Sequence, residues 1–249
     1  MAGFNADLTN RFAAAFFLMG KFLRFSLFLA FLILLVGRTQ TLAGYNVQQV
    51  VFFFLTFNLV DIISQFLLRG VYHFRPLIVT GNFDFILTKP LNPLFSSLAR
   101  RTDILDLLTL IPLVLYIIFF LASGQVVTTL TGILFYLVLV LNALLVALAL
   151  HIIVLCIGVL TTEVDHLIWI YRDLTNMGRV PIDIYREWLR GFLIFVIPVG
   201  VLMTFPAKAL MGLLSWQWVL FSIGLSVIFL WGSIRFWRYA LNRYSSASS

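Results

Sequence analysis

The chain has 249 residues, of which 62% are hydrophobic and only 11% are charged, and its formal net charge is +7. Soluble domains carry roughly 25% charged residues, so this composition excludes a soluble domain and indicates an all-α integral membrane protein. Lys and Arg gather at the ends of apolar runs, where they set the orientation of membrane helices. We therefore expect a lipid bilayer around the protein and no nucleic-acid partner.

The first predicted helix covers residues 1–20. Polar residues lie on one side of it, and large apolar side chains recur at every fourth position on the other, at Phe4, Leu8, Phe12 and Phe16. This pattern predicts an N-terminal interfacial helix lying along the membrane surface. It either anchors the first span or acts as a lever on the cytosolic surface. We expect no cleavable signal peptide, because the region before the first apolar core is long and patterned.

A helix needs about 20 apolar residues to cross a hydrocarbon core of about 30 Å. Five runs meet this need, at residues 21–37, 47–68, 105–123, 129–157 and 216–234. Basic residues precede the first span, fill the loop after the second and follow the last, whereas the turn at 124–128 is uncharged. The positive-inside rule therefore predicts that both termini are cytoplasmic. Six crossings are then required, because the number of crossings must be even.

The loop at residues 69–104 is far longer than the usual connection of about 4–6 residues, and it is charged and contains prolines. A short helix is predicted over residues 82–88. It starts after Gly81, has Asp84 in its first turn, where the helix dipole favours an anion, and stops before Pro90. Its apolar side chains could fill a groove on a soluble partner, or they could lie in the lipid headgroups: Phe83, Phe85, Ile86 and Leu87.

A second helix is predicted in the same loop, after Pro90. Asn92 is a favourable N-cap and Pro93 a favourable first helical residue. We expect this helix to run through Leu98 and Arg101 towards the third span.

The sixth span has two possible placements. In the first, residues 188–205 cross, and residues 161–187 form a cytosolic amphipathic stretch, which hydropathy and charge favour. In the second, residues 160–177 cross, and residues 180–214 dip into the membrane from the outer side and turn back. Three prolines, Pro181, Pro198 and Pro206, support the second because they break this region into short helices. The sequence pattern alone does not decide between these two placements of the span.

Polar residues inside spans need a reason, because an ionisable side chain there costs roughly 2.5–3.5 kcal/mol on insertion scales. In the second span Asn58, Asp61 and Gln65 follow one another at intervals of three and four residues, so they share a helix face. Such a stripe lines a transport pathway or a dimer interface, or it bonds to neighbouring helices. The pattern does not choose between these roles.

Four ionisable residues near the candidate fifth span form a second group: Glu163, Asp165, Arg172 and Asp173. We predict an internal salt-bridge network in which Arg172 pairs with one of the three carboxylates, on its own helix or on a partner's. Glu163 and His166 also stand one helical turn apart, which is a spacing found in metal sites. The chain has no second such pair, so we expect no metal site.

Four stretches taken together are similar to a known family. They are Gly-Asn-Phe-Asp-Phe-Ile-Leu-Thr-Lys-Pro-Leu-Asn-Pro-Leu at 81–94, Arg-Val-Pro-Ile-Asp-Ile-Tyr-Arg-Glu-Trp-Leu at 179–189, Phe-Val-Ile-Pro-Val at 195–199 with Phe-Pro-Ala at 205–207, and Tyr-Ser-Ser-Ala at 244–247. In this order they resemble the ABC type-2 exporter permeases, and within them a bacterial subfamily of six-span subunits. The similarity covers essentially the whole chain.

The resemblance implies a single permease domain with a crossing at residues 160–178 and an outer re-entrant segment at 180–214. It also implies coupling to a separate ABC ATPase subunit, which would bind ATP and Mg, so that this chain has no cofactor of its own. A second permease copy or a related chain would complete the pathway in the bacterial inner membrane. The coupling residues would be Gly81, Asn82, Phe83, Asp84, Phe85, Ile86, Leu87 and Lys89.

The residues themselves agree with a transport subunit that is not an enzyme. There is no Gly-x-x-x-x-Gly-Lys-Ser/Thr phosphate loop and no His-Glu-x-x-His motif. Energy would therefore come from another protein. The alternative is a stand-alone transporter or channel driven by an ion gradient, with Asp61 as its proton or cation site. The sequence does not indicate the transported substrate.

Overall fold

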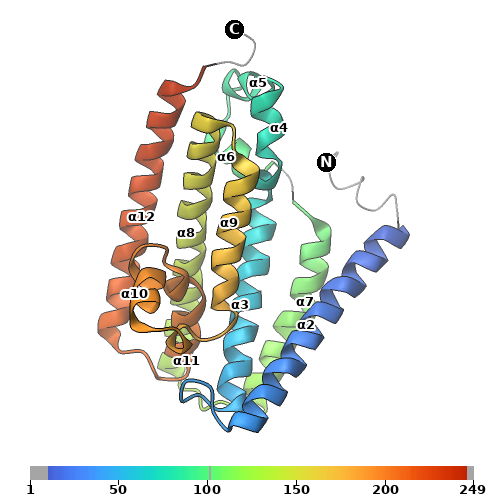
Figure 1. The fold of residues 1–249 in the computed structure, drawn as a ribbon, viewed down its shortest axis with the longest axis vertical. Helices are drawn as coiled ribbons and strands as arrows, with labels where there is room; N and C mark the ends of the chain where they lie inside the picture. The colour runs from blue at the N-terminus through green and yellow to red at the C-terminus, as the bar shows by residue number, and fades with distance from the viewer. Residues whose placement is uncertain (1–10, 101, 246–249) are drawn as a thin grey trace.

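In the computed structural model, residues 11–100 and 102–245 are described, and they fold into a bundle of helices (Figure 1). The long helices are α2 (Arg11–Thr39), α3 (Val47–Leu68), α7 (Ile104–Ala122), α8 (Leu130–Thr161) and α12 (Trp216–Arg243). Within the described ranges, five helical segments are long and apolar enough to cross a membrane, or six if one bent pair of shorter helices counts as a span. The prediction of an all-α integral membrane protein is confirmed.

Two groups of short helices interrupt the long ones. The group between α3 and α7 consists of η1 (Arg69–His73), α4 (Phe74–Val79), α5 (Asp84–Leu87) and α6 (Pro93–Leu98). The group between α8 and α12 consists of α9 (Val164–Asn176), η2 (Met177–Arg179), η3 (Ile182–Ile184), α10 (Glu187–Phe195), the π-helix η4 (Gly200–Thr204) and α11 (Phe205–Leu210).

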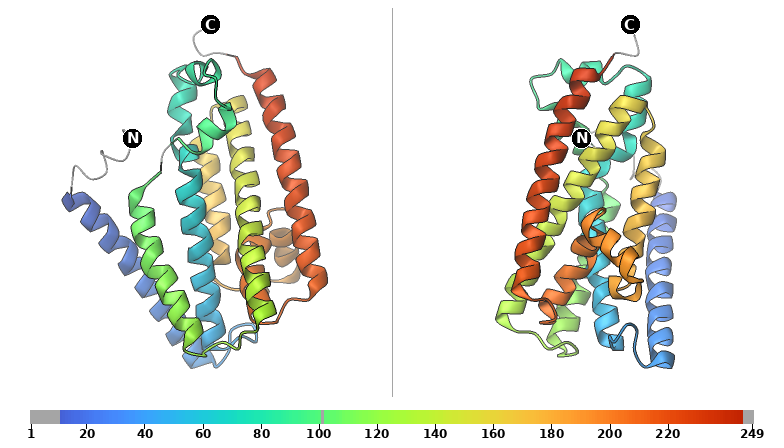
Figure 2. Two further views of the ribbon diagram at one scale, coloured as in Figure 1. Left: turned by 180° about the vertical axis from the view of Figure 1, so that it is seen from behind. Right: turned by 60° about the vertical axis from the view of Figure 1, so that its left-hand side comes forward.

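The bundle has two chemically different ends. The start of α2, the end of α12 and the helix α5 lie at one end, while the turns at residues 40–46 and 124–128 lie at the other (Figures 1 and 2). Neither turn contains a charged residue. The first and last long helices thus begin and end at the same end of the molecule, as an even number of crossings requires.

Local chemistry sets several helix boundaries. At the start of α3, the Asn46 side chain accepts a hydrogen bond from the Gln49 N–H at 2.9 Å, and the Gln49 side chain accepts one from the Asn46 N–H at 3.0 Å. This reciprocal pair satisfies two amides that the helix leaves free. Thr129 caps α8, and α8 ends where Thr162 adopts a φ of +64°, a left-handed conformation that stops a helix.

Helix α8 is the centre of the bundle, and α12 packs along it (Figure 1). The two helices are joined by buried polar side chains: the Ser226 hydroxyl donates to Asn142 Oδ1 at 2.5 Å, and the Asn142 amide donates to the Ser222 carbonyl at 3.2 Å. Helices in a bilayer associate through such hydrogen bonds and close packing, since lipid offers no hydrophobic driving force between them.

The N-terminal region differs from the prediction. Residues 1–10 lie outside the described ranges, and residues 11–20 belong to α2, which continues without a break into the first span. The boundary predicted near residue 20 is therefore wrong. A strong apolar pattern on both sides of that boundary sustains one helix, which leans away from the bundle towards its Arg11 end (Figure 2).

The structure forms no straight span over residues 188–205. The helices Glu187–Phe195 and Gly200–Leu210 are bent by 83° relative to each other, at the break that contains Pro198. Helix α9 instead returns alongside α8 from the end where α8 stops (Figure 1). Its 13 residues span about 20 Å at 1.5 Å per residue, which is less than a hydrocarbon core. The chain between α8 and α12 thus crosses the bundle in several short pieces.

Candidate functional site

The loop after α3 folds into a compact unit at the end of the bundle. Helix α5 lies within the short helix predicted at residues 82–88, and Gly81, with a φ of +71°, makes the turn before it. The Phe83 N–H donates to the Leu77 carbonyl at 2.9 Å, which holds this turn on α4.

The second predicted helix of the loop is also present, but it is shorter. The Asn92 side chain accepts from the N–H groups of Leu94 and Phe95, at 2.9 and 3.4 Å, and Pro93 opens α6. The start is confirmed. The helix ends at Leu98 and not further along the loop, and Arg101 itself lies outside the described residues.

Some of the predicted coupling residues face inwards. Phe83 is fully buried, with its ring centroid 5.2 Å from that of Tyr244, 5.2 Å from that of Phe74 and 6.4 Å from that of Trp237. Ile86 is buried beside it. Neither side chain is available to fill a groove on a partner, because both are buried, and Phe83 fastens the loop to the end of α12. Burial, and then the neighbouring Asp84 carboxylate, raise the pKa of Tyr244 to about 12.

Other residues of the loop face outwards and form an apolar surface. Phe85 is 66% exposed and Phe95 is 67% exposed, and two leucines between them in the chain are also exposed. We call this surface the docking patch: Phe85, Leu87, Leu91 and Phe95. Lys89 is exposed within the same stretch. Exposed apolar surface of this kind marks a site of interaction with protein or membrane.

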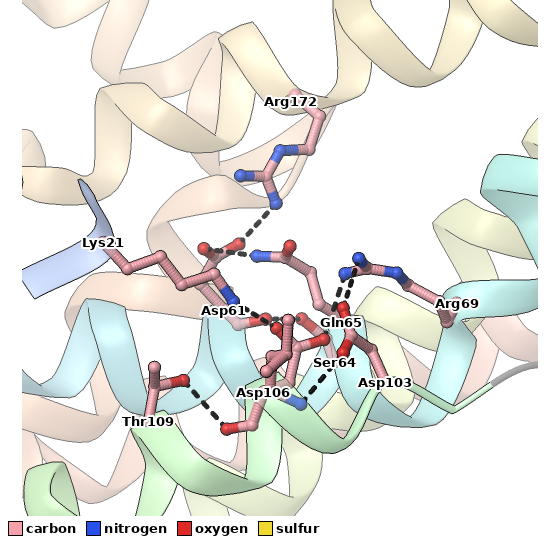
Figure 3. Close-up of polar contacts among 10 residues, drawn as sticks. Lys21, Asp61, Ser64, Gln65, Arg69, Asp103, Asp106, Thr109 and Arg172 are labelled. Carbon is pink, nitrogen blue, oxygen red and sulfur yellow. Dashed lines mark hydrogen bonds and ion pairs between the residues drawn. The ribbon is translucent and has the colours of Figure 1, made fainter. Parts of the chain in front are cut away.

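A buried polar cluster surrounds Asp61 in α3 (Figure 3). Arg172 Nη1 donates to Asp61 Oδ1 at 3.0 Å, and the Gln65 amide donates to Asp61 Oδ2 at 2.7 Å. The Ser64 hydroxyl donates to the Asp61 backbone carbonyl. Asn58, predicted on the same stripe, donates instead to the carbonyl of Phe54 one turn earlier. Asp61 is therefore the point at which α3 is joined to α9.

A second network of charges joins three helices near the same end. Asp106 of α7 accepts from Lys21 of α2 at 2.5 Å and from Arg69 of η1 at 3.0 Å, and Arg69 also donates to Asp103 at 2.6 Å (Figure 3). We call these four residues the Asp106 network. Two carboxylates balance two cations in it. Sequence reasoning placed these residues at span ends and missed their contact, because they are far apart in the chain.

The predicted network of Glu163, Asp165, Arg172 and Asp173 is not formed within the described chain. Arg172 pairs with Asp61 of α3, whereas Asp165 lies 3.7 Å from Arg75, Glu163 contacts His166 at 2.7 Å, and Asp173 has no ion pair with a described residue. The reason is geometric. Asp165 lies seven residues from Arg172, which is about 10.5 Å along a helix, and Asp173, as its neighbour in sequence, faces another direction.

A cavity of about 910 Å³ lies between α2, α3, α7 and α9. The predicted polar stripe of Asn58, Asp61 and Gln65 lines it, together with Arg172. Its remaining wall is rich in aromatic side chains from α2 and α3. Ligand pockets commonly measure about 300–1,000 Å³, so this volume is large enough for a small ligand. A role of the stripe in transport stays a prediction.

A further polar cluster lies towards the opposite end. Asp183 accepts from Lys208 at 2.7 Å and from the Tyr45 hydroxyl at 2.9 Å, and Arg190 lies 3.9 Å away. Burial, and then the hydrogen bond to the Asp183 carboxylate, raise the pKa of Tyr45. The cluster fastens the turn after α2 to the short helices before α12. No periodic pattern connects these residues, so the sequence offered no signal for it.

Comparison with known proteins gave one result. A family model described as "ABC-2 family transporter protein" matches residues 22–248, which is most of the chain. The comparisons with curated proteins and with solved structures found no match.

Proposed function

The chain belongs to the ABC-2 family of transporter proteins, and on this premise we propose that it is the membrane permease of an exporter driven by a separate ATPase subunit. The ATPase binds ATP and Mg, and the end of the bundle that carries α5 faces the cytoplasm of a bacterial cell. Residues 180–214 form the outer re-entrant segment in this arrangement. A second permease copy or a related chain completes the pathway, as one six-span chain provides half of it.

The observation that carries this proposal is the docking patch. Its large apolar side chains are exposed at the tip of the bundle, next to Lys89, while other apolar side chains of the same loop are buried in the protein: Phe74, Ile78, Phe83 and Ile86. A loop that only connected two spans would not need a folded, anchored support for exposed phenylalanines. We assign the patch to contact with the ATPase.

The anchoring of the loop also explains how movement could reach the membrane. Phe83 packs against Trp237 and Tyr244 at the end of α12, so a shift of the docked loop acts on that helix. At the other side of the loop, Arg69 is bonded to α7, and α7 is bonded to α2 through Lys21. Three long helices are thus connected to one docking surface.

The contacts of Asp61 argue against the ion-driven alternative. Its candidate site, Asp61, is already occupied by an arginine and an amide at 3.0 and 2.7 Å. A transported cation would therefore have to displace both donors to reach this carboxylate.

The test is association with a candidate ATPase when the two proteins are expressed together. Phe85→Asp puts a charge into the exposed patch, so we expect loss of co-purification and of permease-stimulated ATP hydrolysis with an unchanged melting temperature. The matched control is Val127→Asp, because Val127 is 84% exposed in the turn at the opposite end. Phe83→Ala should lower the melting temperature as well, since Phe83 is buried. Normal association of Phe85→Asp would refute the coupling assignment.

A further inference from the structure

Three arginines line the cavity that contains the Asp61 carboxylate. Arg172 forms the ion pair with it, and Arg24 and Arg179 belong to the same lining. One carboxylate balances one of these cations. The Asp106 network is balanced within itself, so within the described part of the chain the two remaining arginines of the cavity have no carboxylate paired with them.

The two unbalanced arginines have free bonding capacity. Among the residues that the structure describes, neither Arg24 nor Arg179 has a hydrogen bond or an ion pair, and their charges repel each other. Arg179 is instead held between two rings, 5.5 Å from the centroid of Phe28 and 5.7 Å from that of Phe57. Such contacts use the face of the guanidinium group and leave the N–H donors at its edge available.

The position of these two arginines in the fold favours a bound ligand. Arg24 lies near the middle of α2, and Arg179 ends the helical segment that follows α9. A charge at membrane depth is costly, and such residues usually face a partner charge or a functional site. Residues 11–100 and 102–245 supply no ion pair for these two, so an external anion is the chemistry that fits.

The rest of the cavity suits an apolar chain. Phe25, Phe54 and Tyr116 line it from three helices. Phe17 of α2 and Trp169 of α9 also line it while being largely exposed, so they mark its open side, between α2 and α9. A ligand could enter there from the membrane with its chain against aromatic side chains and its head towards the arginines.

We propose that this cavity binds an amphiphile with an acidic headgroup, held by Arg24 and Arg179, and that such an anion is the class of molecule the permease transports. The transport part rests on the proposed function, whereas the binding part does not. The acidic head could belong to a lipid of the bilayer or to a free single-chain amphiphile.

The test uses the full chain in phosphatidylcholine nanodiscs and two probes with the same brominated twelve-carbon chain, one ending in phosphate and one in phosphocholine. Bromine quenches nearby tryptophan fluorescence, and the part of the quenching that Trp169→Phe removes reports on the cavity. We expect half-maximal quenching by the phosphate probe at an about tenfold lower concentration, because its head carries net negative charge to two arginines whereas phosphocholine is zwitterionic; tenfold corresponds to about 1.4 kcal/mol.

Three variants decide the assignment. Arg24→Gln should abolish the preference for the phosphate probe, Arg24→Lys should retain most of it, and Arg235→Gln, an equal charge change on the exposed side of α12, should leave it intact. Equal quenching by both probes in the unaltered protein would overturn the proposal. An equal loss in Arg24→Gln and Arg235→Gln would also overturn it, because a general surface charge would then explain the preference.

The source of the acidic head is found by adding phosphatidylglycerol to the nanodiscs. Competition that disappears in Arg24→Gln identifies a bilayer lipid as a ligand, and absence of competition identifies a free amphiphile. The measurement needs neither ATP nor the ATPase. Failure of co-purification with preserved phosphate preference would therefore reject the proposed function alone, and the opposite result would reject the binding site alone.

Discussion

Neutralising Asp61 should loosen the attachment of α9 to α3. The Asp61 and Arg172 side chains are only 13% and 15% exposed, and their atoms are 3.0 Å apart. Removing one partner of a buried pair leaves an unpaired charge and costs about 3–5 kcal/mol. Because neither side chain is fully buried, we take the lower end for Asp61→Asn. About 3 kcal/mol corresponds to a melting temperature lowered by roughly 6–12 °C in a chain of this size.

The surroundings predict an order among the variants. Asp61→Asn leaves three arginines without a carboxylate, whereas Arg172→Gln leaves Asp61 near Arg24 and Arg179. Asp61→Asn should therefore be the more destabilising of the two. The double variant Asp61→Asn with Arg172→Gln leaves no broken pair, so its effect should be smaller than the sum of the single effects.

The assay is thermal unfolding of the purified protein in detergent, followed by tryptophan fluorescence. Arg75→Gln is the matched control, because Arg75 also contacts a residue of α9, Asp165. This contact is 3.7 Å long, and both side chains are about half exposed. An exposed pair contributes about 0–1 kcal/mol, so the control should change the melting temperature little. The reasoning fails if Asp61→Asn is no more destabilising than Arg75→Gln, or if the single effects simply add.

Two further predictions concern the loop unit. Gly70→Ala should destabilise the protein in the same unfolding assay, because an added Cβ would lie 2.1 Å from the Ser97 carbonyl oxygen and 2.5 Å from that of Leu98. The control is Gly224→Ala, which has open space around it and should be neutral or slightly stabilising. The raised pKa of Tyr244 means that its protonated form stabilises the folded state below about pH 10 and that this contribution is lost as the pH rises towards 12. Tyr244→Phe should remove that part of the pH dependence of the melting temperature. An identical decline of the melting temperature at alkaline pH in both proteins would contradict this prediction.

The sequence predicted the long apolar helices best. The helix predicted at residues 47–68 has the same bounds in the structure, and the one at 216–234 begins at the predicted residue. Such a run has few alternatives, because a backbone inside lipid must satisfy its own hydrogen bonds and a helix does so within one segment. Helix N-caps could also be predicted from the sequence, as Asn92 and Pro93 show, because a cap acts over about three residues.

Predictions failed more often where they depended on contacts between residues that are far apart in the chain. The four apolar residues of the predicted coupling helix looked equivalent, yet Phe83 and Ile86 are buried and Phe85 and Leu87 are exposed. Which side of a short helix is covered depends on Trp237 and Tyr244, more than 150 positions further along the chain, so no local pattern could reveal it. The partner of Arg172 was missed for the same reason.

The sequence by itself determined that this is a helical membrane protein, where its long helices lie and which family it resembles. These properties follow from composition, from the length of apolar runs and from motifs, all of which are local. Only the tertiary structure decided which charges meet. It joined Asp61 to Arg172, and it brought Lys21 and Arg69 to Asp103 and Asp106. Within the described residues it left two arginines of the cavity without an ion pair. The physical reason is that an ion pair depends on distance in space, which helix packing sets and residue spacing along the chain does not.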